Sequence, residues 1–107
     1  MSSLDVFQRK YEDCLRQGDL ESLTSLFDAH TLVPDEALIQ KGYAFCIEEG
    51  LFDRLQKLQE LYGFSPRLDK EFVHFVYRKY DRQGWWEKMH LLRELTGVYF
   101  QDVIFSD

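Results

Sequence analysis

The side chains of this 107-residue chain that could carry out chemistry are two cysteines, three histidines and an adjacent pair of glutamates. Acid–base catalysis needs carboxylates or imidazoles held together in one pocket. Glu48 and Glu49 are the closest carboxylate pair, but adjacent residues of a helix point in different directions. The glycines occur singly, so there is no glycine-rich loop for phosphate, and no nucleophile has an identifiable base. We therefore predict that the protein is not an enzyme and uses no cofactor.

The cysteines, Cys14 and Cys46, each lie four residues before a glycine, at positions that repeat along the chain. Equivalent positions on packed helices lie about 8–10 Å apart. A disulfide needs Cα atoms within about 7 Å of each other. The histidines show no metal-ligand spacing with either cysteine. The sequence therefore predicts two free, buried thiols and no metal site.

Residues suited to binding a partner gather between positions 75 and 85. Phe75 and Trp85 are aromatic at repeat positions that are mostly polar in the other copies, and exposed tryptophans are common anchors of protein interfaces. Arg78 and Arg82 share one helical face at i, i+4. Two alternatives are a neutralised, solvated charged face and a Trp85 that packs on the C-terminal tail. The candidate partner-binding residues are Phe75, Arg78, Lys79, Arg82 and Trp85.

Three glycines, Gly18, Gly50 and Gly84, set the register of the elements that position these residues. They recur with a period of roughly 33 positions, which is typical of stacked two-helix repeats. Apolar residues follow each glycine at offsets +2, +5, +8 and, in the last two copies, +11: Leu20, Leu23 and Leu26; Phe52, Leu55, Leu58 and Leu61; Trp86, Met89, Leu92 and Leu95. Offsets −11, −7 and −4 form a second helical face: Phe7, Tyr11 and Cys14; Ile39, Tyr43 and Cys46; Val73, Tyr77 and Tyr80. We expect the side chains at +2, Trp86 included, to pack in the core.

This register predicts a helix, a tight turn at the glycine and a second helix in each copy. The predicted helices span about 3–17, 19–28, 35–49, 51–62, 69–82 and 85–96. The fold class is all-α: a single domain, 1–107, of three stacked antiparallel helix–turn–helix repeats in a short α-solenoid, with six helices and a C-terminal tail. The repeats span about 3–32, 34–65 and 68–97, and the tail 98–107 is expected to fold back over the last repeat.

The glycine-anchored pairs, over most of the chain, resemble helical-repeat families, above all ankyrin repeats, with tetratricopeptide and pentatricopeptide repeats second. Gly18-Asp-Leu-Glu-Ser-Leu-Thr-Ser-Leu-Phe27 is similar to the second helix of an ankyrin repeat. The Thr-Pro-Leu-His opening of the ankyrin first helix is absent, since repeat 2 has Lys41-Gly-Tyr-Ala there. A non-repetitive helical bundle is the remaining alternative. The ankyrin resemblance implies partner binding by the inter-repeat loops, 32–36 and 64–69, and by the surface of the first helix of each repeat.

Charge is unevenly distributed: residues 1–53 carry a net −7 and residues 54–107 a net +1. The acidic total of −6 argues against nucleic-acid binding, while the asymmetry would permit a homo-oligomer. The N-terminus lacks signal-peptide features, and no apolar run reaches the ~20 residues that span a bilayer. We therefore expect an intracellular protein, cytoplasmic or nuclear, that acts as a scaffold-like protein–protein interaction module. The alternative is an RNA-binding repeat of pentatricopeptide type that uses Arg78, Lys79 and Arg82.

Overall fold

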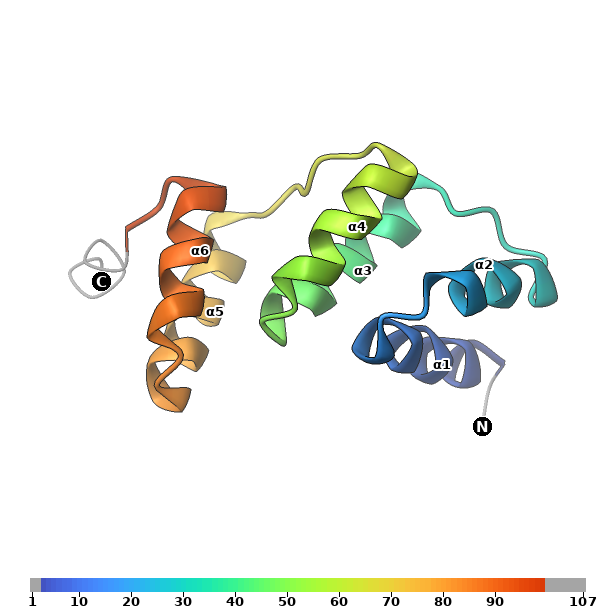
Figure 1. Ribbon diagram of the computed structural model, residues 1–107, viewed down its shortest axis with the longest axis horizontal. Helices are drawn as coiled ribbons and strands as arrows, with labels where there is room; N and C mark the ends of the chain where they lie inside the picture. Colours follow the sequence, from blue (N-terminus) through green and yellow to red (C-terminus); the bar gives the residue numbers. More distant parts are fainter. Residues whose placement is uncertain (1–2, 100–107) are drawn as a thin grey trace. The chain divides into compact units, whose positions relative to one another are not determined.

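The computed structural model describes residues 3–99, and within that range the chain is all-helical, with six α-helices and no strand (Figure 1). The helices form three hairpins. Hairpin 1 is α1 (Ser3–Gln17) and α2 (Leu20–Ala29), hairpin 2 is α3 (Glu36–Glu48) and α4 (Phe52–Tyr62), and hairpin 3 is α5 (Lys70–Gln83) and α6 (Trp86–Thr96). The all-α class is therefore confirmed for these residues, and the predicted helix ends agree closely with the observed ones.

Three helices begin at an aspartate that caps the first turn. The Oδ1 atom of Asp19 accepts a hydrogen bond from the Ser22 N–H at 3.1 Å. Asp35 and Asp69 cap α3 and α5 in the same way, at 2.9 and 2.7 Å. Each cap satisfies a backbone donor that the helix itself cannot, which stabilises a helix by about 1 kcal/mol. These caps explain why the starts of α2, α3 and α5 could be predicted from the sequence.

The turn inside each hairpin has the same backbone geometry. Gly18, Gly50 and Gly84 adopt φ values of +75°, +73° and +72°, which is the left-handed conformation predicted for them. In each turn the residue after the glycine donates a backbone hydrogen bond to the residue at −4, over 2.7–3.0 Å: Asp19 to Cys14, Leu51 to Cys46, and Trp85 to Tyr80. This bond satisfies a carbonyl left over at the end of the first helix.

The chain divides into two compact units, Met1–Pro66 (unit 1) and Arg67–Asp107 (unit 2). Unit 1 contains hairpins 1 and 2, which pack through α1 and α3. The Tyr11 hydroxyl group donates to the Leu38 carbonyl at 2.8 Å, and the ring lies against Gly42 of α3. The core of unit 1 consists of Phe7, Tyr11, Leu15, Leu23, Leu26, Phe27, Ile39, Tyr43, Cys46, Ile47, Leu55 and Leu58.

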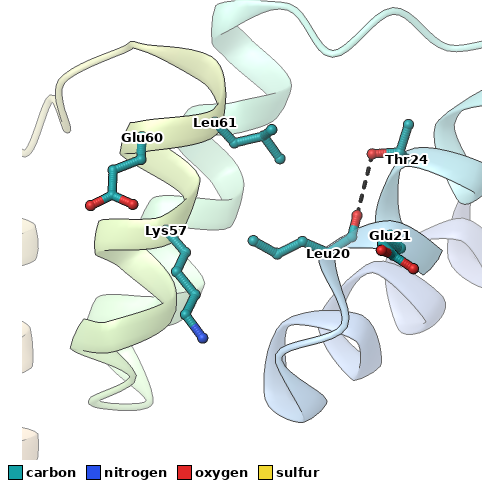
Figure 2. A pocket seen from close by; sticks show the side chains of 6 residues that line it. All are labelled: Leu20, Glu21, Thr24, Lys57, Glu60 and Leu61. Carbon is teal, nitrogen blue, oxygen red and sulfur yellow. Dashed lines mark hydrogen bonds between the residues drawn. The ribbon is translucent and has the colours of Figure 1, made fainter.

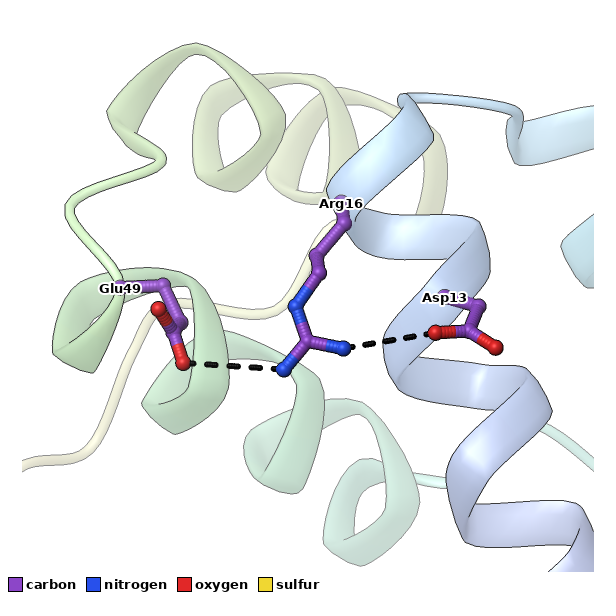
Figure 3. Close-up of polar contacts among 3 residues, drawn as sticks. All are labelled: Asp13, Arg16 and Glu49. Atoms are coloured by element: carbon purple, nitrogen blue, oxygen red, sulfur yellow. Dashed lines mark hydrogen bonds and ion pairs between the residues drawn. The ribbon is translucent and has the colours of Figure 1, made fainter.

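Polar contacts also join the two hairpins of unit 1. The Arg16 guanidinium lies 3.3 Å from the Asp13 carboxylate on its own helix and 3.8 Å from the carboxylate of Glu49, the C-cap residue of α3 (Figure 3). The same guanidinium lies 5.1 Å from the ring centre of Phe45. From α4, Arg54 donates to the backbone carbonyl of Arg16 at 3.4 Å. Arginine side chains therefore link the end of α1 to both helices of hairpin 2.

Unit 2 contains hairpin 3, whose buried side chains are Val73, Val76, Tyr77, Tyr80, Met89 and Leu92. The Tyr77 hydroxyl group donates to the carbonyl of Val98, just after α6. In hairpin 2, Tyr43 makes the corresponding bond to the carbonyl of Phe64 at 2.7 Å. Both bonds span 21 residues. The prediction that the tail folds back over repeat 3 concerns mainly residues 100–107, which lie outside the described part of the chain.

Candidate protein-interaction surfaces

The apolar residues on the second helix of each hairpin do not all face the same way. Two residues spaced by three in an α-helix are separated by about 300° around its axis, so each side chain is displaced by about 60° from the one before. The side chains at +5 and +8 are buried in all three hairpins: Leu23 and Leu26, Leu55 and Leu58, Met89 and Leu92. Offsets +2 and +11 are separated by about 180° and point to opposite sides of the helix. Only the central pair can therefore face the core of its own hairpin.

This geometry corrects the prediction for Trp86. We expected Trp86 to be a core residue, but 62% of its surface is exposed, whereas the neighbouring Trp85 is half-buried. Leu61 and Leu95, at +11, are also exposed. The prediction was wrong because it treated +2 as equivalent to +5 and +8, although +2 lies about 60° and about 120° away from them around the helix.

Trp85 is half-buried, as predicted for a partly exposed residue, but its ring is already in contact with its own hairpin. It is the N-cap residue of α6 and makes no side-chain cap bond. Its ring centre lies 5.7 Å from that of Tyr80. The ammonium group of Lys88 lies 4.1 Å from the ring centre, a cation–π contact. The ring thus packs against the hairpin turn, and Trp86 is the more accessible of the two tryptophans.

Helix α5 places Phe75, Arg78 and Arg82 along one stripe, because their spacings of three and four residues keep them on one helical face. All three are exposed, Phe75 at 46%. Lys79 borders the stripe and is half-buried, and Glu71 extends it toward the start of the helix. The helix therefore brings together four of the five predicted binding residues, whereas Trp85 follows in the turn.

A groove that the sequence did not reveal lies in unit 1, between α2 and α4. Its volume is about 450 Å³ (Figure 2). Leu20, at +2 of hairpin 1, and Leu61, at +11 of hairpin 2, approach it from opposite sides. The described residues that line it are Leu20, Glu21, Thr24, Lys57, Glu60 and Leu61. The helical angles were the available signal, since they direct the side chains at +2 and +11 away from the core of their own hairpins.

The two cysteine thiols have raised pKa values, which make them unreactive at neutral pH. Burial raises the pKa of the Cys46 thiol to about 12, and burial together with Asp19 and Asp13 raises the pKa of Cys14. Both are free thiols, as predicted, but Cys14 is only half-buried, which corrects the expectation that both are buried. The thiolate is the reactive form, so these cysteines are poor nucleophiles at neutral pH.

The glutamate pair and the possible metal ligands also form no reactive cluster in the described part of the chain. Glu49 points toward Arg16, as Figure 3 shows, and both glutamates are half-exposed at the end of α3. Within residues 3–99, no group of three or more histidine, cysteine or acidic side chains is arranged to hold a metal ion. None of the helices in this range is long and apolar enough to cross a membrane.

Comparisons of the chain with protein-family models, with curated proteins and with solved structures found no match.

Proposed function

We propose that this protein is a non-catalytic protein–protein interaction module built from three ankyrin-like helical repeats. The repeat interpretation is supported by local geometry that recurs at the sequence period. All three hairpins turn at a left-handed glycine and make the same backbone bond across the turn. Hairpins 2 and 3 also share an aspartate cap, a left-handed glycine after the second helix, and the tyrosine bond that spans 21 residues.

The observation that carries the proposed function is the exposure of Trp86 on hairpin 3. Tryptophan is enriched among the residues that dominate binding energy at protein interfaces. In unit 1 the equivalent residue, Leu20, faces a neighbouring helix across the groove. In hairpin 1, therefore, the side chain at this position is directed toward a neighbouring element. Phe75 adds a second exposed aromatic ring on the same hairpin, beside the arginines of α5.

The test is affinity capture from the native host with the wild-type protein and with the double variant Trp86→Ala/Phe75→Ala. We expect the double variant to lose a specific partner and to keep its melting temperature, because both side chains are exposed. Leu91→Ala is the matched control, since Leu91 is exposed on the same helix, about 140° away from Trp86. If partner capture is unchanged in the double variant, Trp86 and Phe75 are not part of the binding site. If the melting temperature falls strongly, both rings belong to a core.

RNA binding of pentatricopeptide type is the second candidate, because Arg78 and Arg82 are exposed on the same stripe as Phe75. Stacking on an aromatic ring combined with phosphate contacts is how many proteins bind single strands. Against it stands the acidic charge of the chain, −6 overall.

A further inference from the structure

We propose that the groove between α2 and α4 binds a positively charged amphipathic peptide segment of a partner protein. One apolar side chain of the segment lies between Leu20 and Leu61, and lysine or arginine side chains pair with Glu21 and Glu60. This site lies in unit 1 and does not depend on the surface of hairpin 3. The proposed recognition has an apolar part and an electrostatic part.

The apolar part comes from the two leucines on opposite walls. Leu20 is half-buried and Leu61 is 53% exposed, so both offer hydrocarbon surface to an occupant. A volume of about 450 Å³ falls in the range of ligand sites in proteins. The side chains of Leu20 and Leu61 extend into the space between the start of α2 and the second half of α4, as Figure 2 shows. This shape suits a peptide segment that inserts one side chain and continues along the surface on both sides.

The electrostatic part comes from the charges around the leucines. Residues 17–40, which include all of α2, contain five acidic side chains and no lysine or arginine. Glu21 lines the groove from α2, and Glu60 lines it from α4. Among the residues that the structure describes, neither of these carboxylates forms an ion pair; Glu60 accepts one hydrogen bond, from Gln56 at 3.4 Å. Two acidic residues against one basic residue in the lining of the groove favour a cationic occupant.

Of the described residues that line the groove, Lys57 is the only basic one. Its ammonium group opposes a cationic segment, so its removal has the opposite effect to the removal of either glutamate. This difference in sign distinguishes binding in the groove from general attraction to an acidic protein. Unit 1 as a whole carries 12 acidic and 6 basic side chains, so general attraction is the main competing explanation.

The probe is a fluorescein-labelled amphipathic helical peptide of leucine and lysine, and its twin carries glutamate in place of every lysine. Binding to the full-length protein is measured by fluorescence anisotropy at about 50 and about 500 mM salt. We expect the lysine peptide to bind more tightly at low salt and the glutamate peptide not to bind. Glu21→Gln and Glu60→Gln should each weaken binding by about twofold to fivefold, the effect of an exposed ion pair. Lys57→Gln should strengthen it by a similar factor.

Leu61→Ser tests the apolar contact and should weaken binding about tenfold or more, since burial of a leucine side chain is lost. Leu61 is exposed, so the variant should melt like the wild type. Asp28→Asn is the control, because Asp28 is an exposed carboxylate on α2 that does not line the groove. Its affinity for the lysine peptide should equal that of the wild type.

Several results would overturn the proposal. They are no binding of the lysine peptide to the wild-type protein at low salt, equal binding of both peptides, no effect of Leu61→Ser, or a loss with Asp28→Asn as large as that with Glu21→Gln. Sedimentation of the protein without peptide tests a second copy as the occupant. Self-association that Leu61→Ser abolishes would assign the groove to a homo-oligomer instead.

Discussion

The hydroxyl oxygen of Tyr11 occupies the space that a side chain at Gly42 would need. A Cβ atom built on Gly42 would lie 2.5 Å from this oxygen, and two ring carbons would lie at 3.1 and 3.2 Å. Tyr11 comes from α1 and Gly42 from the middle of α3, so the missing side chain is what allows the two hairpins of unit 1 to approach.

The first prediction is that Gly42→Ala destabilises the protein. An alanine in a helix interior is normally favoured over glycine by about 1 kcal/mol. Here the clash with Tyr11 reverses the sign, and we expect a net loss of about 1–3 kcal/mol, the range for overpacked cores. Chemical denaturation followed by circular dichroism measures it.

The control for this prediction is a double-mutant cycle with Tyr11→Phe, which alone should cost about 1 kcal/mol through the lost hydrogen bond to Leu38. The double variant should lose less than the sum of the two single losses, because the shortest contact involves the hydroxyl oxygen. Strict additivity, or a Gly42→Ala variant more stable than the wild type, would contradict this packing.

The second prediction compares two left-handed glycines of unit 1. Gly63 has φ +79° and nothing within 4 Å of a built Cβ, whereas Gly18 has φ +75° and the Arg54 Nε atom at 3.2 Å. Gly63→Ala should cost about 1–2 kcal/mol from the left-handed backbone alone. Gly18→Ala should cost more, because Arg54 must also move away from the Arg16 carbonyl. In an Arg54→Ala background the two costs should become equal, and unequal costs there would show that Arg54 is not the cause.

The third prediction concerns alkaline pH. Burial raises the pKa of the Cys46 thiol from 9.0 to about 12, so above pH 9 the folded chain holds this proton more tightly than the unfolded chain. The stability that results is fully present below pH 9 and is lost as the pH rises toward 12. The melting temperature should therefore fall as the pH rises above 9, and Cys46→Ala should make the fall shallower. It should not abolish the fall, since burial also raises the pKa of Tyr11, Tyr43 and Tyr77. Parallel curves for variant and wild type would contradict the assignment.

The fourth prediction separates protein binding from RNA binding. If hairpin 3 binds proteins, a labelled single-stranded RNA should show no salt-sensitive retention at about 50 mM salt, and Arg78→Ala/Arg82→Ala should change nothing. Binding through phosphates falls steeply with salt. Retention that is lost both at about 200 mM salt and in the double arginine variant would replace the proposed function with RNA recognition. Lys41→Ala, which removes an exposed lysine of α3, is the control.

Much of the fold could be predicted because its signals are local. An aspartate before an apolar run and a glycine after one mark helix ends through bonds to residues only a few positions away, and Asp69 and Gly84 bound α5 as expected. The shared helical face of Arg78 and Arg82 followed from their i, i+4 spacing alone.

The remaining features depend on contacts between segments distant in sequence. Gly42 looks like an unfavourable residue in a helix until Tyr11, from a different hairpin, is seen to pack on it. The groove needs Leu20 and Leu61 from different hairpins, and only the packing of those hairpins brings them together. The error at Trp86 was of another kind, since the helical angle was available from the sequence and was not applied.

The bonds from Tyr43 to Phe64 and from Tyr77 to Val98 each close a ring of chain around the turn and second helix of a hairpin. Each bond fixes the number of residues between its donor and its acceptor. A residue inserted or deleted between them must therefore break the bond or distort a helix. The Gln40 side chain also donates to the carbonyl of Ser65 at 2.7 Å, so the short segment 66–68 lies between the last of these bonds of hairpin 2 and the Asp69 cap of α5. Changes of length during evolution should therefore accumulate in this short segment, and the hairpins themselves should keep a constant size.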